Sequence, residues 1–190
     1  MTWRPIPALC AALVFTLAGC SMADPAPPAD SGAHGTSAEL DELLRRPDAE
    51  TVLAGQDRML AEISAALTRI IPGSRWEPSN TRSDVACAEF ASTRGLKYYS
   101  ALYTSATPVP PELWDMSSDA VIDIARRYGY TAEVSRSPAP GPGQVANLDI
   151  RDTVGGYVTF GSQTAASFGA TTGCYLTAAD KQAARAAATG

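Results

Sequence analysis

Residues 47–71 read PDAETVLAGQDRMLAEISAALTRII and decide the fold. Apolar side chains recur there at steps of three, four and seven, which places them on one face of a helix. Pro47 suits the first turn of a helix, and Asp48 and Glu50 suit its positive end. Pro72-Gly73 ends the pattern. The stretch therefore predicts a helix over 47–71 whose buried stripe comprises Leu53, Leu60, Ile63, Leu67, Ile70 and Ile71.

Two shorter helices are predicted on either side of this one. The first starts at a capping box over Thr36–Glu39 and ends near Arg46, which precedes a proline. The second is capped by Ser117 or Ser118 and runs through Tyr128. Residues 75–95 are predicted to be irregular, and the alanine-rich tail after residue 177 to be a frayed helix.

Strands are predicted where aromatic and β-branched residues lie between Gly and Pro breaks. They cover 96–106, 130–135, 145–152, 157–161 and a segment between 165 and 176. Consecutive strands with short turns favour antiparallel pairing, and the long helix needs an apolar surface to cover. The order predicts an α+β fold, a two-layer sandwich of a mixed, mainly antiparallel sheet with helices on one face.

The N-terminus carries the three parts of a secretory signal. A short region with Arg4 precedes an apolar run from about Ile6 to Ala18, which is too short to span a bilayer of about 30 Å as a helix. The run ends in Leu17-Ala18-Gly19-Cys20, a bacterial lipobox. We expect residues 1–19 to be removed and Cys20 to carry acyl chains such as palmitate. The alternative is an ordinary signal peptide whose cleavage site includes a cysteine.

Residues 20–36 are predicted to form a tether. They are rich in Pro, Ala, Gly and Ser and have almost no large apolar side chains, so they cannot bury enough surface to fold. Residues 37–190 would then form a single α+β domain, held by the lipid at the extracytoplasmic face of the cell membrane.

The four cysteines have different predicted fates. Cys10 leaves with the signal peptide and Cys20 is lipidated, so Cys87 and Cys174 remain. An oxidising compartment favours a disulfide between them. The alternatives are a redox pair or a metal site, but the spacing is unlike Cys-x-x-Cys and the sole histidine, His34, lies in the tether.

Several of these features occur together in one known family. They are the lipobox, the tether, the helix opened by residues 45–48 (RRPD), the isolated Cys87 and the closing residues 172–174 (TGC). Together they resemble the LppA-type lipoproteins of mycobacteria and related actinobacteria, over about residues 38–180. The resemblance implies a cell-envelope lipoprotein of undefined activity, with a lipidated Cys20 and the cysteine pair.

No motif indicates catalysis, so no catalytic residue, cofactor or metal site is predicted. A hydrolase triad needs a histidine in the folded domain, and no G-x-S-x-G or Ser-x-x-Lys pattern is present. Asp149 with Asp152, and Asp119 with Asp123, are interpreted as solvated carboxylates rather than an acid/base pair or a calcium site. The net charge of −5 does not favour binding to nucleic acid, which is itself negatively charged.

The predicted function is a binding or structural role in the envelope, with a cell-wall component or an envelope protein as partner. The strand over 96–106 offers the best ligand surface, because tyrosine combines an apolar ring with a polar tip. Tyr99 and Tyr103 are the candidate contacts, since they share a face of that strand. Two alternatives stay open: a histidine-independent hydrolase of envelope polymers, and a lipid carrier.

Overall fold

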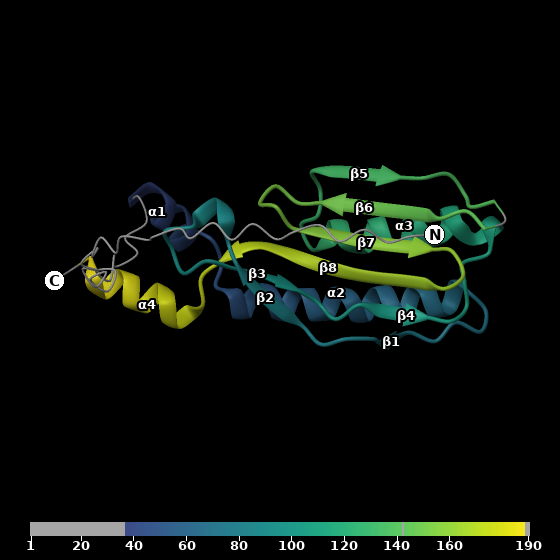
Figure 1. Ribbon diagram of the computed structural model, residues 1–190, viewed down its shortest axis with the longest axis horizontal. Coiled ribbons are helices and arrows are strands. Elements are labelled where there is room, and N and C mark those ends of the chain that lie inside the picture. The colour runs from purple at the N-terminus through teal and green to yellow at the C-terminus, as the bar shows by residue number, and fades with distance from the viewer. Residues whose placement is uncertain (1–36, 142, 189–190) are drawn as a thin grey trace, which may run out of the picture. The chain divides into compact units, whose positions relative to one another are not determined.

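The computed structural model describes residues 37–141 and 143–188 (Figure 1). The predicted signal peptide, Cys20 and the tether lie outside these residues, and so does His34. The described chain contains four α-helices: α1 (Ser37–Arg45), α2 (Ala49–Ile70), α3 (Trp114–Arg127) and α4 (Ala178–Ala187). Two 3₁₀ turns, η1 (Ala88–Phe90) and η2 (Pro111–Leu113), accompany them.

Eight strands form one sheet around β8, which is its longest strand. The strands are β1 (Glu77–Pro78), β2 (Ser83–Ala86), β3 (Leu96–Tyr99), β4 (Tyr103–Ser105), β5 (Glu133–Arg136), β6 (Ala146–Arg151), β7 (Tyr157–Ser162) and β8 (Ala166–Tyr175). The main order is β1-β4-β8-β7-β6-β5, and β3 also pairs with β8 and carries β2 on its other side. Every pairing within the described residues is antiparallel.

The helix α2 begins two residues later than predicted. Asp48 is its N-cap, and the Asp48 carboxylate accepts a hydrogen bond of 2.8 Å from the backbone N–H of Thr51. Pro47 therefore precedes the cap instead of occupying the first turn. The predicted stripe is buried at Leu60, Ile63 and Leu67.

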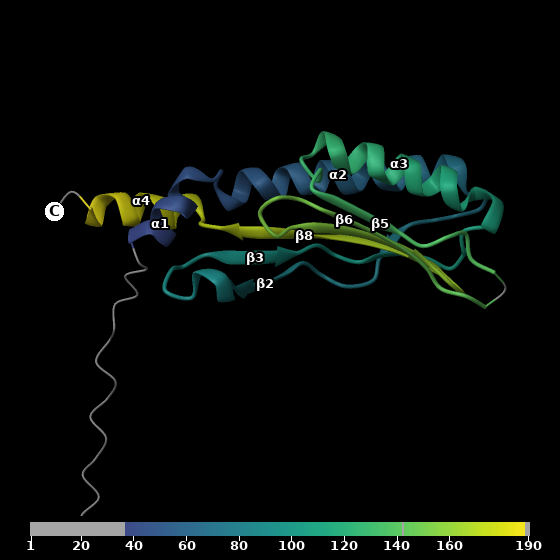
Figure 2. The ribbon, with the colours of Figure 1, turned by 90° about the horizontal axis from the view of Figure 1, so that it is seen from above.

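Helices α2 and α3 lie side by side on one face of the sheet (Figure 2). The core between the layers takes alternate residues of β6 and β7, as the two-residue period of a strand requires. Trp114 of α3 stacks on Phe160 of β7, with ring centroids 5.2 Å apart. This arrangement confirms the predicted α+β fold, with helices covering one face of an antiparallel sheet.

A smaller apolar cluster lies where α1 and α4 meet the end of β8. It comprises Leu43, Cys87, Phe90, Cys174 and Leu176. The helix α4 is capped by Thr177, and the buried Lys181 ammonium donates to the backbone carbonyls of Leu44 and Arg46. The predicted helix after residue 177 is confirmed as α4, and the ammonium of Lys181 fastens it to the end of α1.

The predicted strand over 96–106 is two strands, β3 and β4, and the sequence pattern missed the break between them. At the break, the Ser100 hydroxyl accepts from the backbone N–H of Ala170, and the Asn80 side chain accepts from the N–H of Leu102. At this break, side-chain oxygens thus accept the hydrogen bonds that backbone carbonyls would accept in a regular β-ladder. The preceding segment, predicted to be irregular, contributes β1 and β2.

The start of α3 was also predicted wrongly. The helix begins at Trp114, directly after η2, and both Ser117 and Ser118 are fully buried inside it. Serine is a favourable N-cap residue, which is why one of the two serines was predicted to cap the helix. Instead, their small side chains lie on a tightly packed face of α3.

Candidate functional site

A cleft of about 230 Å³ opens where the first half of α2 passes the end of β8. The segment after α3 and the turn between β6 and β7 close its remaining sides. The lining residues are Pro47, Val52, Gly55, Gln56, Tyr128, Tyr130, Asp152, Thr172 and Tyr175. The cleft thus combines aromatic surface with a few polar groups, which is the usual make-up of a small-molecule site.

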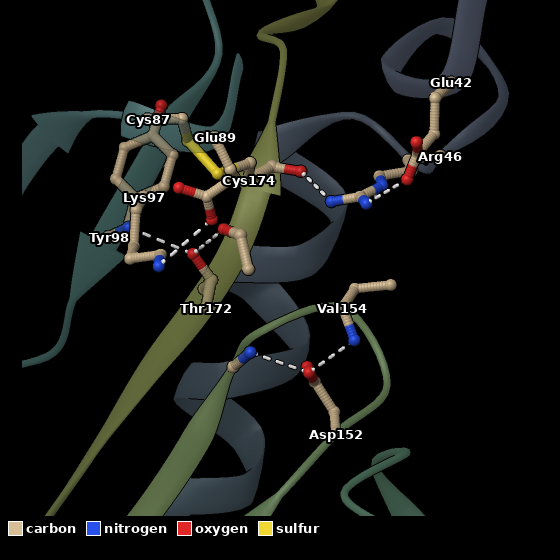
Figure 3. A network of polar contacts seen from close by, with 12 residues as sticks. Glu42, Arg46, Cys87, Glu89, Lys97, Tyr98, Asp152, Val154, Thr172 and Cys174 are labelled. Carbon is tan, nitrogen blue, oxygen red and sulfur yellow. Dashed lines mark hydrogen bonds and ion pairs between the residues drawn. A yellow bond between two sulfur atoms is a disulfide. The ribbon is translucent and has the colours of Figure 1, made fainter. Parts of the chain in front are cut away.

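Backbone contacts hold the start of α2 against the end of β8. The N–H of Ala49 donates to the carbonyl of Leu176 at 2.9 Å. The guanidinium of Arg46 donates to the carbonyl of Cys174 at 2.9 Å and also pairs with Glu42 (Figure 3). These bonds fix the spacing between the two elements that form the cleft walls.

Helix geometry directs Val52, Gly55 and Gln56 to the same wall, because residues three and four apart share a helix face. A Cβ added at Gly55 would meet no atom within 4 Å. The glycine thus leaves space that a larger side chain at the same position would take. The helix accepts this residue at a cost of about 0.5–1 kcal/mol relative to alanine.

Gln56 is the unusual residue of the cleft. Its side chain is only 3% exposed, and neither its amide oxygen nor its amide nitrogen has a hydrogen-bond partner among the described residues. Burial raises the pKa of the Tyr130 hydroxyl, and the nearby Gln56 amide offsets a small part of that rise, although the geometry between the two groups falls short of a hydrogen bond. Both a donor and an acceptor are therefore available at one buried point.

Two tyrosine hydroxyls add donors to the same cleft. Burial raises the pKa of Tyr130 and of Tyr175, and the Asp152 carboxylate raises both further. Both hydroxyls therefore stay protonated at neutral pH. The Tyr130 hydroxyl makes only a long contact of 3.4 Å to the carbonyl of Thr171.

Asp152 is held by the turn that it begins (Figure 3). Its Oδ1 accepts from the backbone N–H groups of Val154 and Gly156, at 2.9 and 2.6 Å. The turn presses against β8, since a Cβ on Gly173 would lie 2.2 Å from the carbonyl oxygen of Val154. A glycine at 173 is therefore required for this close approach.

The rim of the cleft is braced by an ion pair. The Tyr128 hydroxyl and the Arg127 guanidinium both donate to the carboxylate of Glu62 on α2, each at 2.6 Å. These hydrogen bonds, with Tyr128 foremost, hold the pKa of Glu62 below its usual value. The ring of Tyr128 is thereby fixed at the mouth of the cleft.

The two tyrosines predicted as ligand contacts are not brought together. Tyr99 pairs with Thr171 of β8, whereas Tyr103 pairs with Phe168, three residues away. An odd separation along a strand puts the partners on opposite faces, so the prediction that the tyrosines share a face is wrong. Tyr103 stacks on Phe168 beside the core, while Tyr99 is 37% exposed.

The other predicted site residues have structural surroundings. Cys87 and Cys174 form a disulfide that ties η1 to the end of β8. Asp119 pairs with Arg136 at 2.7 Å. Among residues 37–141 and 143–188, no group of three His, Cys, Asp or Glu side chains is placed to hold a metal ion. Within the same ranges, no helix has the length and apolarity needed to cross a bilayer.

Gln56 is absent from the predicted site residues, although the sequence carries a signal for it. Gln56 follows Leu53 by three residues and precedes Leu60 by four, so it falls inside the apolar stripe of α2. A polar side chain at such a position is a candidate ligand contact when it also lines a cleft, as Gln56 does. The buried polar groups of Trp76, Ser117 and Ser118 likewise have no partner among the described residues, but they do not line the cleft. The cleft around Gln56 could not be predicted from the sequence, because its other walls come from segments that are far apart along the chain.

Fold and site together define a disulfide-bridged α+β protein with a small cleft beside its longest helix. The chain belongs to the LppA family, which matches residues 24–178 and is described as "Lipoprotein confined to pathogenic Mycobacterium". This confirms the resemblance inferred from the lipobox, the tether and the cysteine pair. The family is one of lipoproteins, which agrees with the predicted lipidation motif.

Two solved structures are similar to this fold. The lipoprotein LppA from Mycobacterium tuberculosis has a TM-score of 0.59 and 15% sequence identity, over 76% of this chain and 90% of that one. A DUF4853 family protein from Actinomyces odontolyticus has a TM-score of 0.48 and 12% identity, over 70% and 72%. The first of these likenesses supports the α+β fold. No curated protein matches the chain.

Proposed function

We propose that this chain is a cell-envelope lipoprotein that binds a small ligand in the cleft beside Gln56. The buried amide of Gln56 carries the proposal. A buried polar group without a hydrogen bond costs about 1–3 kcal/mol, and a ligand that bonds to it recovers that free energy. Gln56 lines the cleft with its amide buried, so a ligand there reaches the amide when the side chain turns toward it.

The proposed anchor is the lipidated Cys20. A signal peptide over residues 1–19 would be removed, and residues 20–36 would tether a single α+β domain, 37–190, at the extracytoplasmic face. Membership of a lipoprotein family supports this arrangement. The disulfide between Cys87 and Cys174 also supports it, because such bonds persist in oxidising compartments.

Binding is favoured over hydrolysis by the state of the cleft's carboxylate. Oδ1 of Asp152 already accepts two backbone N–H groups, which suits a structural carboxylate better than a general acid or base. A lipid carrier is disfavoured by size. The cleft volume of about 230 Å³ is too small to enclose the acyl chains of a lipid.

Replacing Cys20 with Ser should abolish acylation and move the protein from the membrane fraction to the soluble fraction. A serine offers no thiol for the lipid, and a single domain without acyl chains has no anchor. Labelling with a fatty-acid analogue and cell fractionation measure the effect. Cys10→Ser is the matched control, since Cys10 lies in the predicted signal peptide and its loss should leave labelling intact. Continued labelling of the Cys20 variant would refute the anchor.

Replacing Gly55 with Leu should block ligand binding while the fold is kept. The new side chain enters open space in the cleft, and leucine favours the helix more than glycine does. The full-length protein is extracted from a Mycobacterium host, and native mass spectrometry detects its bound molecule. We expect the bound mass in the wild type and in Gly55→Ala, whose side chain is small, and its loss in Gly55→Leu. A bound mass that persists in Gly55→Leu, or its absence from the wild type, would contradict the proposal.

A further inference from the structure

We infer that the cleft binds one uncharged, hydroxyl-rich ring, that is, a single sugar unit of a neutral glycan. The inference rests on the proposed binding function and specifies its ligand. Three observations carry it: the charge of the lining, the hydrogen-bonding groups of the cleft, and its position in the fold.

The charge of the lining disfavours charged ligands of either sign. The residues that line the cleft include one carboxylate, Asp152, and no Lys, Arg or His, so an anion would meet repulsion. The nearby Arg46 guanidinium offers an anion little, because it is already bonded to the Cys174 carbonyl and to Glu42. A cation gains little, because two backbone N–H groups already bond to Asp152 and the Arg46 guanidinium lies 6.0 Å from the Tyr175 ring centre. An uncharged ligand meets neither obstacle.

The hydrogen-bonding groups fit neighbouring hydroxyls. The Gln56 amide offers a donor and an acceptor side by side, and each hydroxyl of a sugar both donates and accepts. The protonated hydroxyls of Tyr130 and Tyr175, which also line the cleft, add further polar groups. Three tyrosines also supply ring surface against which the apolar face of a sugar packs. A purely apolar ligand would leave the Gln56 amide unpaired.

The position of the cleft disfavours an extended peptide. Peptides that add to a sheet need a free strand edge. Beside this cleft, β8 pairs with β3 on one edge. Its other edge, beyond the pairing with β7 that ends at Thr171, is occupied by the turn at Val154 and by the Arg46 guanidinium, which bonds to the Cys174 carbonyl. The volume of about 230 Å³ fits one ring rather than a run of residues. We therefore expect the cleft to take a sugar unit that stands at the end of a glycan or protrudes from it.

Nuclear magnetic resonance of the full-length lipoprotein, in a polyoxyethylene detergent that carries no sugar, tests the inference. The probe signal is the side-chain NH₂ of Gln56, assigned through its absence in Gln56→Met. Neutral glucose, galactose, mannose, arabinose and N-acetylglucosamine are titrated one by one, with glucose 6-phosphate and glucuronate as charged counterparts.

We expect at least one neutral sugar to shift the Gln56 signal saturably, and Gly55→Leu to abolish the shift. The charged counterparts should bind at least about tenfold more weakly, since each brings an unpaired charge to the cleft. Equal or tighter binding of the charged sugars, or no shift with any neutral sugar, would overturn the inference. If the bound mass that depends on Gly55 is still found, the proposed binding function survives that failure. If that bound mass is absent as well, the proposed binding function and the inferred sugar ligand are both refuted.

Discussion

The variant Cys87→Ala/Cys174→Ala should lose about 4–5 kcal/mol of unfolding free energy. The bridged cysteines are 87 residues apart, and in the chain-entropy model a closed loop of that size restricts the unfolded chain by about this amount. A domain of this size is typically stable by only about 5–15 kcal/mol. Urea unfolding followed by circular dichroism measures the change, provided that both proteins unfold in one transition.

Two controls separate the bridge from local packing. Reduction of the wild type should produce a similar loss, because it opens the same loop without removing side chains. Hydrogen exchange should rise first in α1 and α4, since α1 packs on the cluster around the bridge and Lys181 of α4 bonds to the end of α1. A loss below about 1 kcal/mol, or two free thiols per chain in the unreduced protein, would show that the bridge does not stabilise the fold as described.

Leu67→Ala should cost about 2–5 kcal/mol of unfolding free energy. Leu67 is fully buried on the face of α2 that covers the sheet, so the truncation leaves a cavity between the two layers. Denaturant unfolding gives the magnitude, and an unchanged m-value would show that the denatured state is the same.

Arg69→Ala is the matched control for the assignment of the buried face. Arg69 lies two positions further along the same helix and is exposed, so its loss should change stability by less than about 0.5 kcal/mol. Equal effects of the two substitutions would place the buried face of α2 on another side.

The long helix and the last three strands could be predicted because their side chains repeat with the period of the element. Leu60, Ile63 and Leu67 follow the helical step, and β6 alternates buried and exposed positions. The predicted bounds of these elements differ from the observed ones by only a few residues. Periodicity was sufficient because one face of each element is buried by the same core.

The region between 75 and 118 could not be predicted in this way. The break between β3 and β4 depends on the Ser100 hydroxyl and the Asn80 amide, which bond to backbone groups far along the chain. No local pattern marks such bonds. Ser117 and Ser118 have the composition of a helix cap, and only the packing of α3 shows that they are buried.

The candidate site could be predicted from the sequence even less well than this region. The tyrosines at 99 and 103 were grouped by counting along an unbroken strand, and one extra residue at the break moved them to opposite faces. Gln56 fell inside the apolar stripe, but its neighbours Tyr130, Asp152 and Tyr175 come from three separate segments. Their proximity is a property of the folded sheet and its turns.

The proposed function requires that the Gln56 amide is kept for a ligand and not for the fold. The unfolding free energy of ligand-free Gln56→Met tests it most directly, because methionine has a similar shape and no amide. We predict that the variant is more stable than the ligand-free wild type by about 1–3 kcal/mol, since an unpaired buried amide is removed, and that it binds no ligand. A variant that is less stable by a similar amount would show that the amide bonds within the protein, and would contradict the account.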